Sequence, residues 1–346
     1  MERINKFISH GEPASQADFR SLFLLPILLL LIVGLALLLS TSQRGYAKER
    51  TEYPDKQIEW IVPYGPGGGY DVYSRAIIKV LPKYLPNRVN IVIKNISGAG
   101  GRRGSAFLYR SNPDGYTIGI LNPIGLITSD VVKTSKEFDV EKYTYIATCV
   151  RGVAGIFVRA DSVFQTIEDM QRAERVQFAT SGRGSGTWLW GKLIEGLWGV
   201  RIQMVSGYLG TTEYITALLR KDVDAFTIGF TSSLIPYFRS GEIKPLLIFS
   251  RDSWDLVPEA PTLKGTPFGE LEDFSNDRAI AGPPGLPNDI VRTLEIALLK
   301  TLDDPELKKW SETTQNPLYV RNSEETKLCI KETLKLVDKY RDFFKD

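Results

Sequence analysis

The stretch QIEWIVPYGPGGGYDVYSRAIIKVL, residues 57–81, decides the fold class. It opens with alternating apolar residues, passes through a glycine-rich loop and ends with apolar residues at helical spacing. The pattern predicts a strand over residues 57–63 and a helix over residues 71–81, with the loop 65–69 between them. A strand that leads through a short loop into a helix is the repeating unit of α/β proteins.

The same unit recurs along the chain. The predicted strand 176–180 leads through the loop 181–186 to a predicted helix at 187–198, and the strand 202–205 leads through the loop 206–210 to a helix at 211–220. Further predicted strands are 89–93, 116–121, 143–150, 156–159, 224–228, 245–249 and 279–281. Further predicted helices are one that follows the glycine loop 98–101 and runs through residue 108, then 166–174, 233–240, one ending at 302, and 324–344. The alternation predicts an α/β protein with parallel units.

The chain length predicts two lobes. A single hydrophobic core stops growing at about 250–300 residues, and this chain has 346. We place residues 53–150 together with 278–346 in lobe 1 and residues 151–277 in lobe 2, with a ligand cleft between the lobes. The chain is expected to cross between the lobes near residues 150–158 and to return with the strand 279–281.

The N-terminal residues 1–47 are interpreted as a signal peptide or membrane anchor. Residues 22–39 form an uncharged apolar run that follows Arg3, Lys6 and Arg20, and the small residues around Tyr46 offer a cleavage site. The run is long enough for either role, so cleavage and retention in the inner membrane both stay open. Export to the periplasm or another extracytoplasmic location is the prediction.

Composition excludes several functions. The net charge of +2, from 43 Lys and Arg against 41 Asp and Glu, argues against nucleic acid as a partner. The single histidine, His10, lies near the N-terminus, which excludes Ser-His-Asp and Cys-His dyads and argues against a histidine-bearing zinc site. We therefore expect no metal and no cofactor. Cys149 and Cys329 are either buried small apolar residues or a disulfide pair.

The glycine-rich loops are the candidate binding elements. In an α/β sheet the carboxyl ends of the strands lie on one side, and helix N-termini there favour anions such as carboxylate, phosphate or sulfate. Neither a phosphate-binding G-x-x-x-x-G-K-[ST] motif nor a complete G-x-G-x-x-G fingerprint is present at the first strand, so nucleotide binding has no support. The candidate ligand-binding residues are Pro66, Gly67, Gly68, Gly69, Tyr70, Asp71, Ser181, Gly182, Arg183, Gly184, Ser185, Thr187, Tyr208 and Asp224.

Charged residues near these loops have two interpretations each. Arg75, Arg102, Arg103 and Arg183 are either two-point partners of a carboxylate or solvated surface arginines. Asp71 either fixes its loop and caps the helix or accepts a hydrogen bond from a ligand. Asp224 is either a turn carboxylate or, with Asp71, half of an acid–base pair, for which the sequence offers no nucleophile.

Several motifs together resemble the substrate-binding proteins of tripartite tricarboxylate transporters, the Bug or TctC-like family. They are Val62-Pro63-Tyr64 with Pro66-Gly67-Gly68, Gly98-Ala99-Gly100-Gly101 after Asn95, and Pro113-Asp114-Gly115-Tyr116-Thr117. The resemblance covers about residue 53 to the C-terminus. It implies an extracytoplasmic, two-lobed fold like the type II periplasmic binding proteins. It also implies a non-catalytic protein that closes on a small organic carboxylate, a di- or tricarboxylate or a related compound.

By this resemblance the loops 66–71 and 181–187 hold the ligand from opposite sides through backbone N–H groups and water. The expected partners are the large and small membrane subunits of a transporter, and we expect a monomer. Tyr70 stands where the family usually has a small hydroxyl residue, and it either narrows the cleft or offers an aromatic face to the ligand. The alternative function is a membrane-tethered carboxylate sensor that signals to a membrane kinase.

Overall fold

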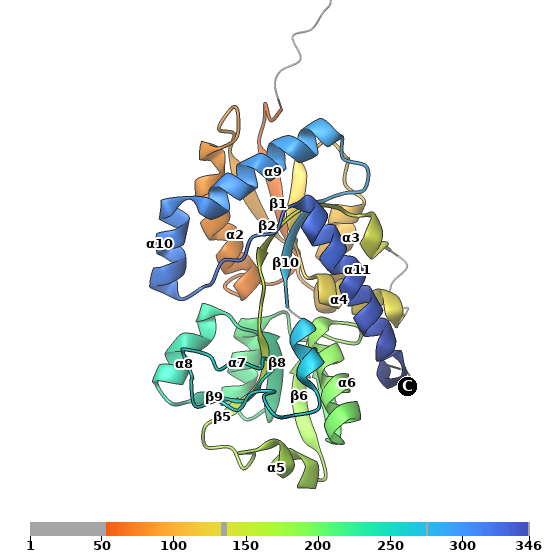
Figure 1. Cartoon of the computed structure of the whole chain (residues 1–346), viewed down its shortest axis with the longest axis vertical. Coiled ribbons are helices and arrows are strands. Elements are labelled where there is room, and N and C mark those ends of the chain that lie inside the picture. Colours follow the sequence, from red (N-terminus) through yellow and green to blue (C-terminus); the bar gives the residue numbers. More distant parts are fainter. Residues whose placement is uncertain (1–52, 133–136, 275, 345–346) are drawn as a thin grey trace, which may run out of the picture. The chain divides into compact units, whose positions relative to one another are not determined.

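The computed structural model describes residues 53–132, 137–274 and 276–344. Residues 52–346 form one compact unit that contains two five-stranded sheets (Figure 1). Residues 1–47, interpreted from the sequence as a signal peptide or membrane anchor, lie outside the described residues. Within the described part of the chain, no helix combines the length and the apolar character needed to cross a membrane.

The first sheet has the strand order β2-β1-β3-β10-β4. Its strands are β1 (Ile58–Val62), β2 (Ile91–Asn95), β3 (Thr117–Leu121), β4 (Thr144–Val150) and β10 (Arg278–Gly282). Strand β1 runs parallel to β2 and β3, with Trp60 opposite Ile93 and Ile118. Strand β10 runs antiparallel to both β3 and β4.

The second sheet repeats this plan with the order β7-β6-β8-β5-β9. Its strands are β5 (Ala154–Arg159), β6 (Val176–Thr180), β7 (Ile202–Ser206), β8 (Ala225–Gly229) and β9 (Ile243–Ile248). Strand β5 is antiparallel to β8 and β9. Both sheets are therefore mixed and not wholly parallel. The antiparallel strands β5 and β10 are the two strands that the chain enters from the other sheet, so neither follows a strand of its own sheet through the crossover of about a dozen residues that joins consecutive parallel strands.

Helices cover both faces of each sheet (Figure 1). On the first sheet, α2 (Gly69–Val80), α9 (Asn288–Asp303) and α10 (Pro305–Thr314) share one face, and α3 (Arg102–Tyr109), α4 (Pro123–Val131) and α11 (Ser323–Lys339) share the other. On the second sheet, α6 (Gly186–Trp198) packs on one face, and α7 (Thr211–Leu219) with α8 (Ile235–Arg239) packs on the other; α5 (Ile167–Arg172) lies at its far end. Because helices cover both faces, strands such as β8 and β10 are buried along their whole length.

Two helices were not predicted from the sequence, α4 and α10. Both begin with the same local signal, a capping side chain followed by proline at the first helical position. Asn122 accepts a hydrogen bond from the Gly125 backbone N–H, and Asp304 accepts one from the Glu306 backbone N–H. The predicted helix 324–344 ends earlier than expected: α11 stops at Lys339, and a short 3-10 turn, η7 (Arg341–Phe344), follows.

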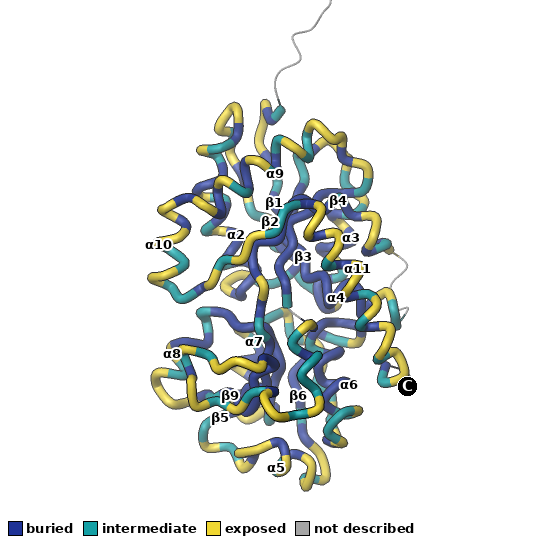
Figure 2. Tube along the Cα trace, viewed as in Figure 1, coloured by how far each residue is buried: buried dark blue, intermediate teal, exposed yellow. Residues whose placement is uncertain are grey.

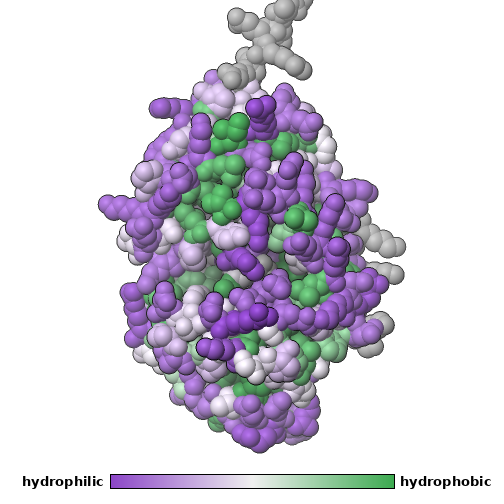
Figure 3. Space-filling view, viewed as in Figure 1, coloured by the Kyte–Doolittle hydropathy of each residue, from purple (hydrophilic) through white to green (hydrophobic). Residues whose placement is uncertain are grey.

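Three apolar clusters form the core. One lies under α2 and α9, one lies under α7, and the largest is continuous from the α3–α4–α11 face of the first sheet to α6 of the second. Figure 2 shows the buried strands, and Figure 3 shows a mostly hydrophilic face with small apolar areas. Cys149 in β4 and Cys329 in α11 are both free thiols, so the structure contains no disulfide between them.

Candidate ligand-binding pocket

A pocket of about 590 Å³, including its opening to solvent, lies where the carboxyl ends of strands from both sheets face each other. Open α/β sheets bind ligands at this edge. The first sheet and its connections contribute Tyr64, Gly68, Gly69, Tyr70, Asn122, Asn276 and Arg278. The second contributes Ser181, Gly186, Thr187, Trp190, Gly210, Thr211, Tyr214, Thr227, Ile228 and Gly229.

Helix N-termini surround the pocket. Helices α2, α6 and α7 begin at the lining residues Gly69, Gly186 and Thr211, and Asn122 is the N-cap of α4. The N-caps of α2 and α7, Gly68 and Gly210, are glycines that place no side-chain cap on the first turn. First-turn N–H groups lack partners within their own helix and carry partial positive charge. The backbone around the pocket therefore favours an anion.

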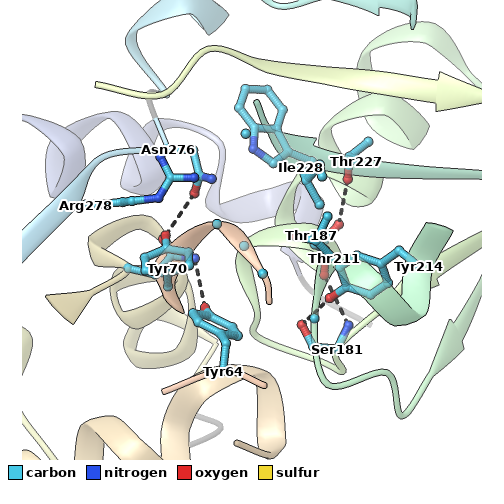
Figure 4. A pocket seen from close by; sticks show the side chains of 17 residues that line it. Tyr64, Tyr70, Ser181, Thr187, Thr211, Tyr214, Thr227, Ile228, Asn276 and Arg278 are labelled. Atoms are coloured by element: carbon cyan, nitrogen blue, oxygen red, sulfur yellow. Dashed lines mark hydrogen bonds between the residues drawn. The ribbon is translucent and has the colours of Figure 1, made fainter. Parts of the chain in front are cut away.

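Hydroxyl groups line the second-sheet wall (Figure 4). Ser181 Oγ and Tyr214 OH share a hydrogen bond of 2.7 Å, and the Thr227 hydroxyl donates to the Thr187 carbonyl at 3.3 Å. The Thr187 hydroxyl also accepts from the Ser181 backbone N–H at 3.2 Å. These contacts hold the hydroxyl groups in fixed positions at the pocket wall.

Aromatic rings line the first-sheet wall. The rings of Tyr64 and Tyr70 lie 4.6 Å apart between centroids, and Asn122 donates to the Tyr64 hydroxyl at 3.0 Å. The Tyr70 hydroxyl donates to Asn276 Oδ1 at 3.4 Å. Burial raises the pKa of both tyrosines above the ordinary value of 10.0, so both remain neutral phenols at physiological pH.

Arg278 supplies the charge of the pocket, and the sequence reasoning missed it. The side chain is 2% exposed, and its Nη2 donates to the Phe230 carbonyl at 3.3 Å. Its guanidinium lies 5.0 Å from the Tyr70 ring centroid and 4.7 Å from that of Tyr73. Among the described lining residues it is the only one of the Asp, Glu, Lys, Arg and His types. The sequence signal that could have identified Arg278 is the position of an arginine directly before the apolar segment Ala279–Gly282.

Five of the predicted site residues line the pocket: Gly68, Gly69, Tyr70, Ser181 and Thr187. The others lie outside the lining: Pro66, Gly67, Asp71, Gly182, Arg183, Gly184, Ser185, Tyr208 and Asp224. Tyr208 instead packs edge-on against Tyr214, which takes the aromatic position in the wall. Ser185 is the N-cap of α6 and accepts from the Trp188 backbone N–H.

Asp71 fixes the loop between β1 and α2. Its carboxylate accepts from the Gly67 backbone N–H at 2.9 Å, from Asn95 Nδ2 at 3.1 Å and from Arg75 Nε at 2.8 Å. Burial alone would raise the pKa of Asp71, but these three hydrogen bonds outweigh it and lower the pKa below the ordinary value of 3.8. The carboxylate is therefore ionised and committed to its own loop.

Asp224 lies at the other end of the second sheet. It directly precedes β8, whereas the pocket lies after the last residues of the strands. Its carboxylate accepts from the Gln177 backbone N–H at 2.8 Å, which closes the start of β6 against β8. Asp71 and Asp224 therefore do not form an acid–base pair.

The arginines singled out in the sequence also point elsewhere. Arg75 is paired with Asp71, and Arg102 Nη1 donates to the Arg183 carbonyl at 2.8 Å. The Arg183 guanidinium lies 6.0 Å from the Trp188 ring centroid. None of these three, nor Arg103, lines the pocket in the described part of the chain. The Arg102 contact instead joins the α3 side of the first sheet to the loop before α6.

Loops of the two sheets are hydrogen-bonded around the pocket. Besides Arg102, the Gly65 backbone N–H donates to the Leu209 carbonyl at 3.4 Å, and the Ser233 hydroxyl donates to the Gly67 carbonyl at 3.2 Å. Each of these bonds joins a residue of the first sheet's loops to a residue of the second's. The structure therefore shows the two sheets in a closed arrangement over the pocket.

Two mixed five-stranded sheets with a pocket at their carboxyl ends form the two-sheet α/β fold of the periplasmic binding proteins. The chain belongs to the tripartite tricarboxylate transporter family of receptors, whose model matches residues 75–340. Members of this family are solute-binding proteins and not enzymes.

Known proteins of this kind are similar along most of the chain. Protein BugT of Bordetella pertussis is 28% identical over 258 residues, which cover 70% of this chain and 75% of BugT. The periplasmic binding protein BugD has a TM-score of 0.74 at 22% identity, over 83% of this chain and 98% of BugD. MatC from Rhodopseudomonas palustris with bound malate has a TM-score of 0.75 at 21% identity, over 85% of this chain and 100% of MatC.

Proposed function

We propose that this protein is an extracytoplasmic receptor that binds a small organic carboxylate in the pocket between its two sheets. The observation that carries the proposal is the convergence of the α2, α6 and α7 N-termini on a pocket whose described lining contains no Asp or Glu. Partial positive charge from several helices, with no internal carboxylate to neutralise it, favours an anionic ligand. The malate bound to MatC, a protein of the same fold, supports a carboxylate as that anion.

The apolar part of the lining favours an organic anion over phosphate or sulfate. Trp190, Ile228 and the rings of Tyr64 and Tyr70 form much of the wall. An inorganic ion would leave these surfaces without a partner, whereas the carbon skeleton of a carboxylate would contact them. A volume of about 590 Å³ lies within the range of roughly 300–1,000 Å³ for small-molecule sites.

The experiment has two steps. Native mass spectrometry of the protein, purified without denaturation, identifies any ligand that remains bound. Titration calorimetry then compares malate, succinate, adipate and benzoate with their neutral amides. We expect at least one carboxylate to bind and its amide to bind much more weakly. Equal affinity for acid and amide, or binding of cations instead, would overturn the proposal.

The proposed partner is a membrane transporter with one large and one small subunit, in line with the family to which the chain belongs. The protein would reach it as an exported receptor directed by residues 1–47, either cleaved or anchored. The intact mass of protein recovered from the cell envelope distinguishes cleavage near residue 47 from retention of residues 22–39. Uptake of the bound carboxylate into vesicles that carry the transporter should require this receptor, and uptake without it would exclude the partnership.

A further inference from the structure

The guanidinium of Arg278 is buried without a full set of hydrogen-bond partners. Its Nη2 donates to the Phe230 carbonyl, but Nε and Nη1 have no partner among the described residues. A buried charge is strongly unfavourable unless it is paired and hydrogen-bonded. Arg278 also lines the pocket, so the free nitrogens belong to a side chain at the ligand site (Figure 4).

The nearest carboxylate in the sequence does not serve as a counter-ion. Asp277 directly precedes β10, and its contacts lie on the opposite face of the sheet from those of Arg278. Asp277 forms an ion pair with Arg321 and accepts from Cys329, both on the α11 side. Arg278 lies on the α2 side, against the rings of Tyr70 and Tyr73. These rings orient the guanidinium without neutralising its charge.

The guanidinium also lies against the N-terminus of α2. A Cβ atom built on Gly69, the first residue of that helix, would be 2.6 Å from Arg278 Nη2. The partial positive charge at the N-terminus of the twelve-residue helix α2 and the buried Arg278 guanidinium therefore lie next to each other. Two neighbouring positive groups repel each other, and an anion bound beside them in the pocket would interact favourably with both.

We propose that Arg278 is the anchor that pairs with one carboxylate group of the ligand, beside the N-terminus of α2. This inference rests on the proposed function and names the side chain that recognises the carboxylate. The rest of the ligand extends along the aromatic wall toward the hydroxyl groups of Ser181, Thr187 and Tyr214, which carry no charge. The site therefore requires one carboxylate and accepts a neutral polar group at the other end.

The test combines a change in the protein with a change in the ligand. Calorimetry is performed on the wild type and on Arg278→Gln with the tightest-binding dicarboxylate among succinate, malate and adipate, and with its monoamide and diamide. In the wild type we expect the monoamide to bind within about tenfold of the acid and the diamide to bind about 100-fold more weakly. Arg278→Gln should bind the acid about 100-fold more weakly than the wild type does, and this variant should bind the diamide nearly as well as the acid.

Arg110→Gln is the matched control, because it removes the same charge from an exposed arginine that pairs with Glu137 at the surface. Its affinity should stay within about twofold of the wild type. If Arg278→Gln binds the acid within about threefold of the wild type, the anchor is refuted while the proposed function stands. If the wild type binds no carboxylate at all, the proposed function fails and this inference fails with it.

Arg278→Lys guards against a variant that does not fold. It keeps the positive charge but lacks the planar donor group, so it should fold and bind the acid about tenfold more weakly than the wild type. The comparison of acid and diamide in the wild type needs no variant. A loss of less than about threefold there refutes a charged anchor even if both variants unfold.

Discussion

Replacement of Gly69 by alanine tests the geometry of the closed pocket. The new Cβ atom would lie 2.6 Å from Arg278 Nη2 and 3.2 Å from both Cβ and Oγ1 of Thr231. Gly69 belongs to α2 of the first sheet, and Thr231 follows β8 of the second, so the methyl group would occupy space where the two sheets meet. The rings of Tyr70 and Tyr73 limit how far Arg278 can move aside. Overpacking of this kind costs about 1–3 kcal/mol, which corresponds to roughly 5- to 150-fold in Kd.

The assay is calorimetry with the best carboxylate, together with thermal unfolding. Because Arg278 belongs to the same sheet as Gly69, the overpacking should also lower the melting temperature of the ligand-free protein, and the better helix propensity of alanine offsets this only in part. The control is Gly65→Ala on the same loop, where the nearest atom to a Cβ, Leu209 Cβ, is 3.8 Å away and the backbone is unstrained. Wild-type affinity in Gly69→Ala, or an equal loss in Gly65→Ala, would refute the reasoning.

Three further predictions concern residues outside the pocket lining. Burial opposes ionisation of Asp71, but hydrogen bonds keep its pKa below 3.8. Its contribution to stability is therefore present above that pH and is lost as the pH falls through the lowered pKa. Asp71→Asn should flatten the decline in melting temperature below about pH 4, and an unchanged decline would argue against this role. Asp224→Asn should lower the free energy of unfolding by about 1 kcal/mol, because the hydrogen bond with the Gln177 backbone N–H is lost, and it should leave the Kd unchanged. A Kd shift of more than about threefold would indicate that Asp224 takes part in ligand binding. Burial raises the pKa of the Cys149 thiol to about 12, so a maleimide at about pH 8 should modify Cys329 before Cys149, and prior labelling of Cys149 would contradict its burial in β4.

The strand–loop–helix units were predictable because their signals are local. The strand 57–63 and the helix 71–81 correspond to β1 and α2, which begins two residues earlier than expected, at Gly69. Glycine, alternation and helical spacing act within a few residues, so a sequence alone displays them. The position of the loops next to one pocket was also predictable from the sequence, because the carboxyl ends of parallel strands lie at the same edge of a sheet.

The pocket lining contains some residues of each predicted loop and not others, for a physical reason. A loop shows which residues are small, but it does not show which way each one faces after closure. Gly68 and Gly69 face the pocket, whereas Asp71 turns back to the Gly67 backbone. The position of Asp224 was predictable from the sequence, because a residue directly before a strand lies at the opposite edge of the sheet from the loops that follow the strands.

Arg278 was beyond the reach of local patterns because its role depends on partners far away in the sequence. Its guanidinium is held by Tyr70 and Tyr73, more than 200 positions earlier, and by the Phe230 carbonyl. An arginine in an apolar strand suggests a surface position or an ion pair when it is read alone. Only the packed structure shows that its neighbour Asp277 is committed to the other face of the sheet.

The location of Arg278 joins ligand recognition to closure. Strand β10 is the return connection from the second sheet to the first, and Asn276, two residues before Arg278, also lines the pocket. The guanidinium extends from the first sheet to the Phe230 carbonyl, just after β8 of the second, and no carboxylate of the described residues forms an ion pair with it there. A carboxylate on Arg278 removes the cost of this unpaired buried charge, whereas a neutral ligand of the same shape leaves it in place. Under the role proposed for Arg278, an anion would stabilise the closed arrangement selectively, and the same residue would distinguish the ligand from its amide and couple binding to the approach of the two sheets.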